Sequence, residues 1–231
     1  RTGAVAIGVG AATAVVLSLA GAKTSVVIGS SAALAIAGGV VAGRKGSEKN
    51  ADDLGEGALI MSAQELVVRG IEKFQAGDPE GAITDFSKAI EINPQDSAAY
   101  YNRGLAKKEL GDPNGSIDDY NKAIGLNPKN APLYSNRGLA KYNLEDYQGA
   151  IDDFNRALEI DAMYVDAYTN RGVSKGELGD MQGAIDDLTM AIEFLPDDWR
   201  LYVDRGNYED MSGDFDSAIS DYGKAILLDP E

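Results

Sequence analysis

An Arg-Gly pair returns every 34 residues through most of this 231-residue chain. Self-similarity at a fixed period of this length is typical of solenoid proteins in which each repeat is one helical hairpin. The period therefore predicts an all-α solenoid of stacked helix pairs over residues 63–231. The five glycines of the repeat are Gly70, Gly104, Gly138, Gly172 and Gly206.

Other positions of the repeat agree with two antiparallel helices in each unit. With residue 63 as position 1, positions 20 and 27 are small in every unit, which lets the helices pack closely, and positions 4 and 24 are bulky. Gly-Asp pairs in four of the units, and a proline about sixteen residues after each of those pairs, mark the ends of the two helices. The predicted units are residues 63–96, 97–130, 131–164, 165–198 and 199–231.

These features make residues 63–231 similar to tetratricopeptide repeats. The resemblance implies five helical hairpins that act as a protein-protein interaction module, with no reaction and no cofactor. The Asn-Arg-Gly variant of the repeat also resembles repeat proteins common in cyanobacteria and plastids. Two positions depart from the family pattern, which usually has an apolar residue at position 7 and an aromatic one at position 11. Here position 7 is always arginine, and position 11 is lysine in four units and Glu209 in the fifth.

The arginines at position 7 need a partner because they lie where two helices should touch. Position 23 is aspartate in all five units, and antiparallel helices with position 8 opposite position 20 bring it near position 7. A guanidinium can bind both oxygens of a carboxylate while its stem covers apolar surface. A row of solvated arginines is the alternative. We predict a structural ion-pair ladder of Arg69–Asp85, Arg103–Asp119, Arg137–Asp153, Arg171–Asp187 and Arg205–Asp221.

The resemblance also implies which residues line a concave groove that binds a partner. In this family the first helix of each unit faces the groove, and here position 6 is asparagine in three units. Amides beside aromatic and aliphatic side chains suit an extended peptide or a partner helix, although asparagines that are simply exposed are the plain alternative. The basic cluster with which some members bind acidic chaperone tails is missing. The candidate partner-binding residues are Tyr101, Asn102, Leu105, Lys108, Asn136, Leu139, Tyr142 and Asn170.

The first 43 residues differ in composition from the repeats. Residues 2–22 and 24–43 contain no charged residue, and only Lys23 separates them. Each run is long enough to cross the roughly 30 Å hydrocarbon core of a bilayer as a helix, and small residues at four-residue spacing favour close helix packing. They predict a transmembrane helical hairpin over residues 1–43 that contacts the lipid bilayer through residues 2–43.

The charges around these apolar runs predict an orientation. Arg1 precedes them and Arg44, Lys45 and Lys49 follow them, so both ends should face the cytoplasm or stroma. The polar linker at residues 44–62 then holds the repeats on that side. With the resemblance to cyanobacterial and plastid proteins, this indicates an integral membrane protein, for example of the thylakoid. A cleaved signal peptide and a buried soluble hairpin are the alternatives.

Composition excludes several classes of function. The chain has no cysteine and no histidine, which excludes thiol nucleophiles, imidazole bases and Cys/His metal sites. The net charge of -16 divides into +4 in residues 1–50 and -20 in residues 51–231, which disfavours nucleic acid and favours basic protein partners. Carboxylate pairs such as Asp118-Asp119 recur with the repeat and are interpreted as exposed faces and ladder partners. We expect no enzyme activity, no metal, no cofactor and no small-molecule substrate.

Together these observations predict a membrane-anchored interaction scaffold, an assembly or repair factor for a membrane complex such as a photosystem. A permanent accessory subunit of such a complex is one alternative, and a soluble adaptor without a membrane span is another. The last repeat carries Ile226 and Leu227 and no polar cap. Either further chain beyond Glu231 or another protein is expected to cover them.

Overall fold

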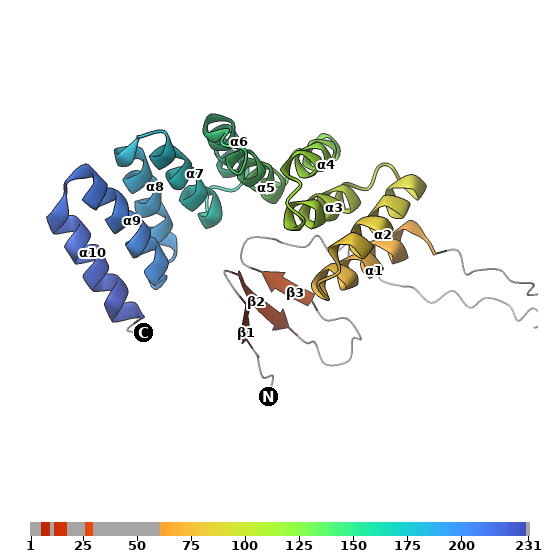
Figure 1. The fold of residues 1–231 in the computed structure, drawn as a ribbon, viewed down its shortest axis with the longest axis horizontal. Helices are drawn as coiled ribbons and strands as arrows, with labels where there is room; N and C mark the ends of the chain where they lie inside the picture. Colours follow the sequence, from red (N-terminus) through yellow and green to blue (C-terminus); the bar gives the residue numbers. More distant parts are fainter. Residues whose placement is uncertain (1–5, 10–11, 18–25, 30–60, 230–231) are drawn as a thin grey trace, which may run out of the picture.

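Five helix pairs make up the repeat region. A computed structural model describes residues 61–229 and three short segments, residues 6–9, 12–17 and 26–29. The helix pairs of residues 61–229 follow one another along an arc (Figure 1). The helices are α1 (Ala63–Gln75), α2 (Pro79–Ile92), α3 (Ser97–Glu109), α4 (Pro113–Leu126), α5 (Ala131–Tyr142), α6 (Tyr147–Ile160), α7 (Val165–Glu177), α8 (Met181–Phe194), α9 (Trp199–Ser212) and α10 (Phe215–Leu228).

The contacts between helices define the two sides of the arc. Each first helix packs against the second helix of its own pair, and each second helix packs against the first helix of the next pair. First helices also contact each other, α1 with α3, α3 with α5 and α5 with α7, whereas the second helices of residues 61–229 have no comparable contacts with one another. The first helices therefore lie on the concave side and the second helices on the convex side.

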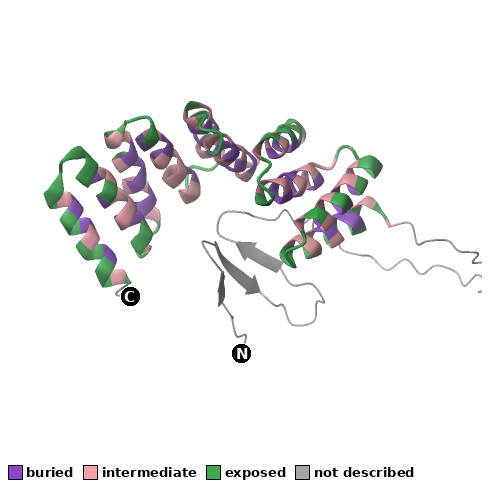
Figure 2. Ribbon diagram, in the orientation of Figure 1, coloured by how far each residue is buried: buried purple, intermediate pink, exposed green. Residues whose placement is uncertain are grey.

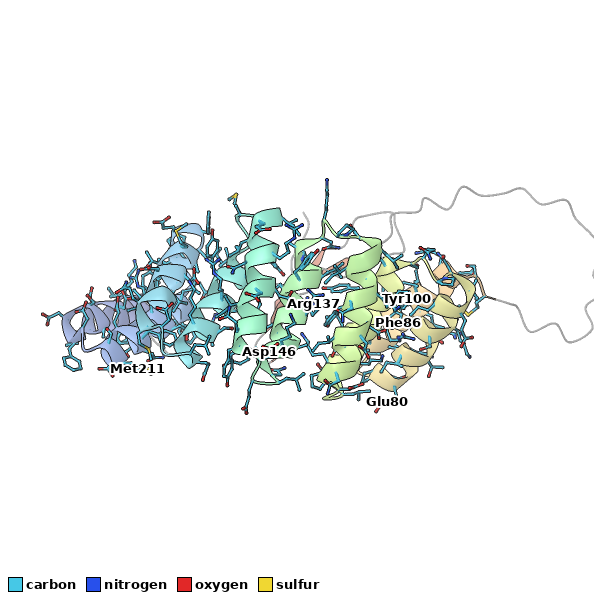
Figure 3. All side chains as sticks on the ribbon, turned by 90° about the horizontal axis from the view of Figure 1, so that it is seen from above. Glu80, Phe86, Tyr100, Arg137, Asp146 and Met211 are labelled. Atoms are coloured by element: carbon cyan, nitrogen blue, oxygen red, sulfur yellow. The ribbon has the colours of Figure 1, made fainter. Side chains whose placement is uncertain are left out.

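The core is a continuous seam between the two layers of helices. Position 24 places Phe86, Tyr120, Phe154 and Leu188 in this seam, where all four are fully buried. The small residues at positions 20 and 27 are buried in all five units, as the sequence predicts. Figure 3 shows how Phe86 and Tyr100 lie in neighbouring pairs and how the side chains fill the space between helices.

A turn of two to four residues joins the helices within each pair. Its next-to-last residue has a left-handed backbone, which glycine adopts without strain; the glycines there have φ angles of 74° to 89°. Glu145 takes this place in the third unit with φ 63°. The last residue of the turn is an aspartate whose side chain accepts a hydrogen bond from the backbone N–H three residues on and so caps the second helix. These aspartates are Asp78, Asp112, Asp146, Asp180 and Asp214.

The helical hairpin predicted for residues 1–43 is wrong where the structure describes those residues. Ala6–Val9 (β1), Ala12–Leu17 (β2) and Val26–Gly29 (β3) are strands of an antiparallel sheet in the order β1-β2-β3. Valine, isoleucine and threonine favour strands, and glycine weakens helices. Apolar length suggested a membrane helix, but the local preference of these residues is for strands.

The rest of residues 1–43 and almost all of the linker predicted at residues 44–62 lie outside the described residues. Within the described part of the chain, no helix combines the length and the apolar character needed to cross a membrane. Membrane attachment of residues 2–43 stays a prediction.

The glycine of position 8 yields a test of the packing. A Cβ on Gly104 would lie 2.7 Å from the ring of Tyr120, whereas the nearest atom to a Cβ on Gly172 would be the Ala184 carbonyl oxygen at 3.2 Å. We expect Gly104→Ala to lower the free energy of unfolding by about 1–2 kcal/mol, because overpacking outweighs the gain in helix propensity. Gly172→Ala should change it by less than about 0.5 kcal/mol, because the two effects nearly cancel there. Urea unfolding followed by circular dichroism measures both, and equal losses would contradict this account.

Candidate partner-binding site

The arginines of position 7 and the aspartates of position 23 are paired in all five units. In each pair the arginine Nε and Nη2 donate hydrogen bonds of 2.5 to 2.9 Å to the two carboxylate oxygens. The aspartates are 1% to 6% exposed, so a charged partner is required in the folded state. The pairs are Arg69–Asp85, Arg103–Asp119, Arg137–Asp153, Arg171–Asp187 and Arg205–Asp221.

A lysine at position 11 adds a second cation to four of these aspartates. Its Nζ lies 2.8 or 2.9 Å from the aspartate Oδ2 and also donates to the backbone carbonyl of position 19. In the first unit, hydrogen bonds from Arg69 and then Lys73 lower the pKa of Asp85 to about 2 against the cost of burial. The four lysines, which the sequence showed as a departure from the family pattern, are Lys73, Lys107, Lys141 and Lys175.

The ladder arginines also connect neighbouring units. The third nitrogen, Nη1, donates to the side chain at position 25 of the preceding unit, as in Arg137 Nη1 to Asn121 Oδ1 at 2.6 Å. The aromatic ring at position 4 lies 5.4 to 5.9 Å from the guanidinium carbon, within cation–π range. Arg137 sits in the middle of the stack (Figure 3). The other links are Arg103–Ser87, Arg171–Asn155 and Arg205–Thr189.

The fifth unit has Glu209 where the other units have the lysine. Glu209 is 7% exposed, its Oε2 has no hydrogen-bond partner within the described structure, and its Oε1 lies 3.7 Å from Arg205 Nε. Burial and the nearby Asp221 raise the pKa of Glu209, while Arg205 opposes this shift. This rung of the ladder therefore holds two carboxylates and one cation.

Exchanging residues between the fifth rung and a complete one tests the role of the lysine. We expect Glu209→Lys to raise the free energy of unfolding by about 1 kcal/mol, because the new ammonium can bind Asp221 and the position 19 carbonyl. Lys141→Glu should lower it by about 3 kcal/mol, because a second carboxylate is buried beside Asp153. Urea unfolding measures both. A loss of stability in Glu209→Lys would show that the fifth rung is not equivalent to the others.

The pH dependence of stability isolates the Glu209 carboxyl. Because its folded-state pKa is raised, the protonated form favours folding. This contribution to stability is present below the unfolded pKa of about 4.5 and is lost as pH rises through the folded value. Asp85 acts in the opposite sense, since its stabilisation is lost as pH falls toward 2. We expect Glu209→Gln to gain stability over the unmodified chain as pH rises from about 4 to 7. A difference between the two proteins that does not vary with pH would contradict the assignment.

The structure buries half of the predicted groove residues. Tyr101, Asn102, Leu105 and Asn136 are at most 3% exposed. Successive first helices pack against each other on the concave side, and these side chains fill the space between them. A partner-contacting role does not suit this placement for Asn102, Leu105 and Asn136, so the groove prediction needs correction there. Tyr101 lines a pocket of about 320 Å³, and its contact with a partner stays a prediction. Asn102 has no hydrogen-bond partner for either side-chain polar atom within the described structure.

Asn136 has a structural role between the first helices α3 and α5. Its Nδ2 donates to Tyr101 Oη at 3.2 Å and to the Pro132 carbonyl at 3.0 Å, and its Oδ1 accepts a hydrogen bond from Lys108 Nζ at 3.3 Å. The remaining candidates are half-buried on the first helices, and their contact with a partner stays a prediction. They are Lys108, Leu139, Tyr142 and Asn170.

A pocket of about 480 Å³ lies between α7 and α9, at the C-terminal end of the arc. Its charged side chains are all carboxylates, and Tyr208 and Met211 contribute apolar surface. Burial and the neighbouring Asp198 raise the pKa of Asp204. Such a site can hold a cationic side chain. The lining residues are Val173, Gly176, Glu177, Asp204, Asn207, Tyr208, Asp210 and Met211.

Gly176 determines the shape of this pocket. It occupies position 12, where the other units have larger residues, and a Cβ here would collide with the ring of Tyr208. Tyr142, a predicted groove residue, donates a hydrogen bond to Glu177 Oε1 at 3.2 Å. Burial and then Glu177 raise the pKa of Tyr142 to about 12. Sequence reasoning missed the pocket, although a glycine in place of a large side chain at position 12 was a visible signal.

Comparisons with known proteins agree with the helix pairs. Residues 70–111 match the family profile described as TPR repeat, and residues 97–130 and 131–164 match the one described as Tetratricopeptide repeat. A comparison with curated proteins finds no match.

Many solved structures are similar to this chain. The crystal structure of MamA is 27% identical with a TM-score of 0.67, and the match covers 70% of this chain and 94% of that one. A MamA structure from Desulfovibrio magneticus is 17% identical with a TM-score of 0.69 over 73% of this chain and 95% of that one. YrrB, described as a TPR protein with an unusual peptide-binding site, is 20% identical with a TM-score of 0.63 over 74% and 88%. The two matches at lower identity show the fold alone.

Proposed function

We propose that the chain is a protein-interaction scaffold of the tetratricopeptide type, which the family matches over residues 70–164 support, and that it binds a basic peptide segment of a partner at the pocket between α7 and α9. The observation that carries this proposal is the composition of the pocket. Glu177, Asp204 and Asp210 line it together with Tyr208 and Met211, and no lysine or arginine is among its lining residues.

This lining suits a lysine or arginine side chain. The carboxylates bind the charged group, while the aromatic ring and the thioether cover the aliphatic stem. The pocket volume of about 480 Å³ lies in the range of sites that enclose small ligands and is sufficient for one or two side chains. The charge of -20 over residues 51–231 attracts a basic segment from a distance and raises its association rate.

We propose a peptide as the class of ligand. YrrB, which is built from the same kind of repeat, has a peptide-binding site. Proteins of this kind are generally interaction scaffolds rather than enzymes, and the absence of enzyme activity in this chain stays a prediction.

The more specific predictions rest on the sequence resemblance alone. An assembly or repair role at a photosystem, a permanent place in a membrane complex and a thylakoid location stay predictions. A soluble adaptor is compatible with the repeat region. The proposed binding of a basic segment holds with or without membrane attachment.

Peptide binding tests the proposed pocket. We expect a short peptide rich in lysine and arginine to bind the chain, with an affinity that falls as salt rises, and its counterpart with glutamate in place of the basic residues to show no binding. The double variant Glu177→Gln, Asp204→Asn should weaken binding about tenfold or more, because charge-assisted hydrogen bonds are lost. Fluorescence anisotropy measures the dissociation constants.

The matched control removes an exposed carboxylate outside the pocket. Asp118→Asn on α4 removes one negative charge and leaves the residues that line the pocket unchanged. It should change the affinity less than about twofold. Equal weakening by the pocket and control variants would show that the whole charged surface, and not the pocket, binds the peptide.

A further inference from the structure

The outer face of α10 is apolar and uncovered. Phe215, Ile219, Ile226 and Leu227 are 61% to 81% exposed. In Figure 2, α10 shows mostly exposed and intermediate residues, whereas the inner helices carry continuous buried stripes. We call these four residues the α10 face.

At two of these positions the same face of every other second helix is covered by a helix, whereas the counterparts of Leu227 at position 29 are exposed in the other four units. Positions 21 and 28, which are Ile219 and Ile226 in the fifth unit, are isoleucine or leucine throughout. In the second unit their counterparts pack with Leu133 and Ala140, at positions 3 and 10 of the following helix α5. Contacts of this kind join each of the first four pairs to the next one. The α10 face therefore has the form of a surface that packs against a helix.

Position 25 argues against a further repeat of the same kind as the occupant. In the four internal interfaces the side chain of this position accepts a hydrogen bond from the ladder arginine of the following unit. In α10 the position is Gly223, which has no acceptor side chain and has open space where a Cβ would lie. The ladder arginine of a following repeat would therefore lack the hydrogen bond that Nη1 makes at the internal interfaces. A helix that carries no such arginine loses no hydrogen bond and can pack closely against Gly223.

The other end of the stack argues against a second copy of the chain. Where internal first helices place small or apolar residues against the preceding unit, α1 has exposed Glu65 and Glu72 at positions 3 and 10. Head-to-tail stacking would press these carboxylates onto Ile219 and Ile226. Two α10 faces packed together would instead join two chains that each carry a charge of -16.

Charge identifies the chemistry of the occupant. The exposed charged residues on α10 and at its two ends are Asp214, Asp216 and Asp229 against the single Lys224, and residues 51–231 carry a charge of -20. We propose that the α10 face docks an amphipathic helix of a partner protein, whose apolar stripe is flanked by lysine and arginine. This rests on the proposed scaffold function and adds a second surface to it, separate from the pocket between α7 and α9.

Two synthetic helical peptides of about 20 residues, with the same leucine stripe but lysine or glutamate on the polar face, test this proposal by fluorescence anisotropy. We expect the lysine peptide to bind, with an affinity that falls as salt rises, and the glutamate peptide not to bind. The double variant Ile226→Gln, Leu227→Gln should weaken binding at least about tenfold. Both residues are more than half exposed, so the variant should keep the circular dichroism spectrum and unfolding midpoint. Ile219→Gln serves as an independent second variant.

Two controls separate this surface from others. Met163→Gln removes an equally exposed apolar side chain from the loop between α6 and α7 and should leave binding of the lysine peptide within about twofold. Because a lysine-rich peptide can also enter the pocket, the α10 variant is measured again in the pocket variant Glu177→Gln, Asp204→Asn, where it should still weaken binding at least about tenfold. If only the pocket variant weakens it, the proposed function stands and the α10 proposal fails. Equal binding of both peptides, or sedimentation that shows a dimer abolished by the α10 variant, would also overturn it.

Discussion

Five buried aspartates are the constraint on which the repeat region depends. A carboxylate that is 1% to 6% exposed is stable only when charged donors surround it, and here one arginine binds both of its oxygens. The arginine comes from the first helix and the aspartate from the second, so the pair fixes how the two helices sit against each other. Glycine at position 8 and a small residue at position 20 let the backbones approach closely enough for the pair to form.

The same arginines also bind neighbouring units to each other. Each has five N–H donors in a planar fork. In the second to fifth units three of its nitrogens are used, two for its own aspartate and one for position 25 of the preceding unit. A lysine could supply the charge but not these fixed directions. In a solenoid, where each unit contacts only its neighbours, such links set the angle between units and therefore the curvature of the concave side.

The sequence predicted the parts of this structure that repeat. The period, the turns and the pairing of Arg103 with Asp119 follow from residues that return every 34 positions. The groove prediction failed at Asn102 and Asn136, because position along a helix does not show how far neighbouring first helices cover a side chain. The strands at residues 6–9, 12–17 and 26–29 were missed because apolar length was weighed above β-branched content.

Three residues that break the period lie in the last two units, and they mark where this solenoid differs from a regular one. Gly176 removes a side chain and makes room for Tyr208 beside the acidic pocket. Glu209 replaces a cation with a buried carboxylate, and Gly223 removes the acceptor that a following repeat would use. Regular positions hold the helices together and cannot distinguish one unit from another. A partner that binds one place on a repetitive surface must be recognised through such exceptions, which is why both proposed surfaces lie at the C-terminal end of the arc.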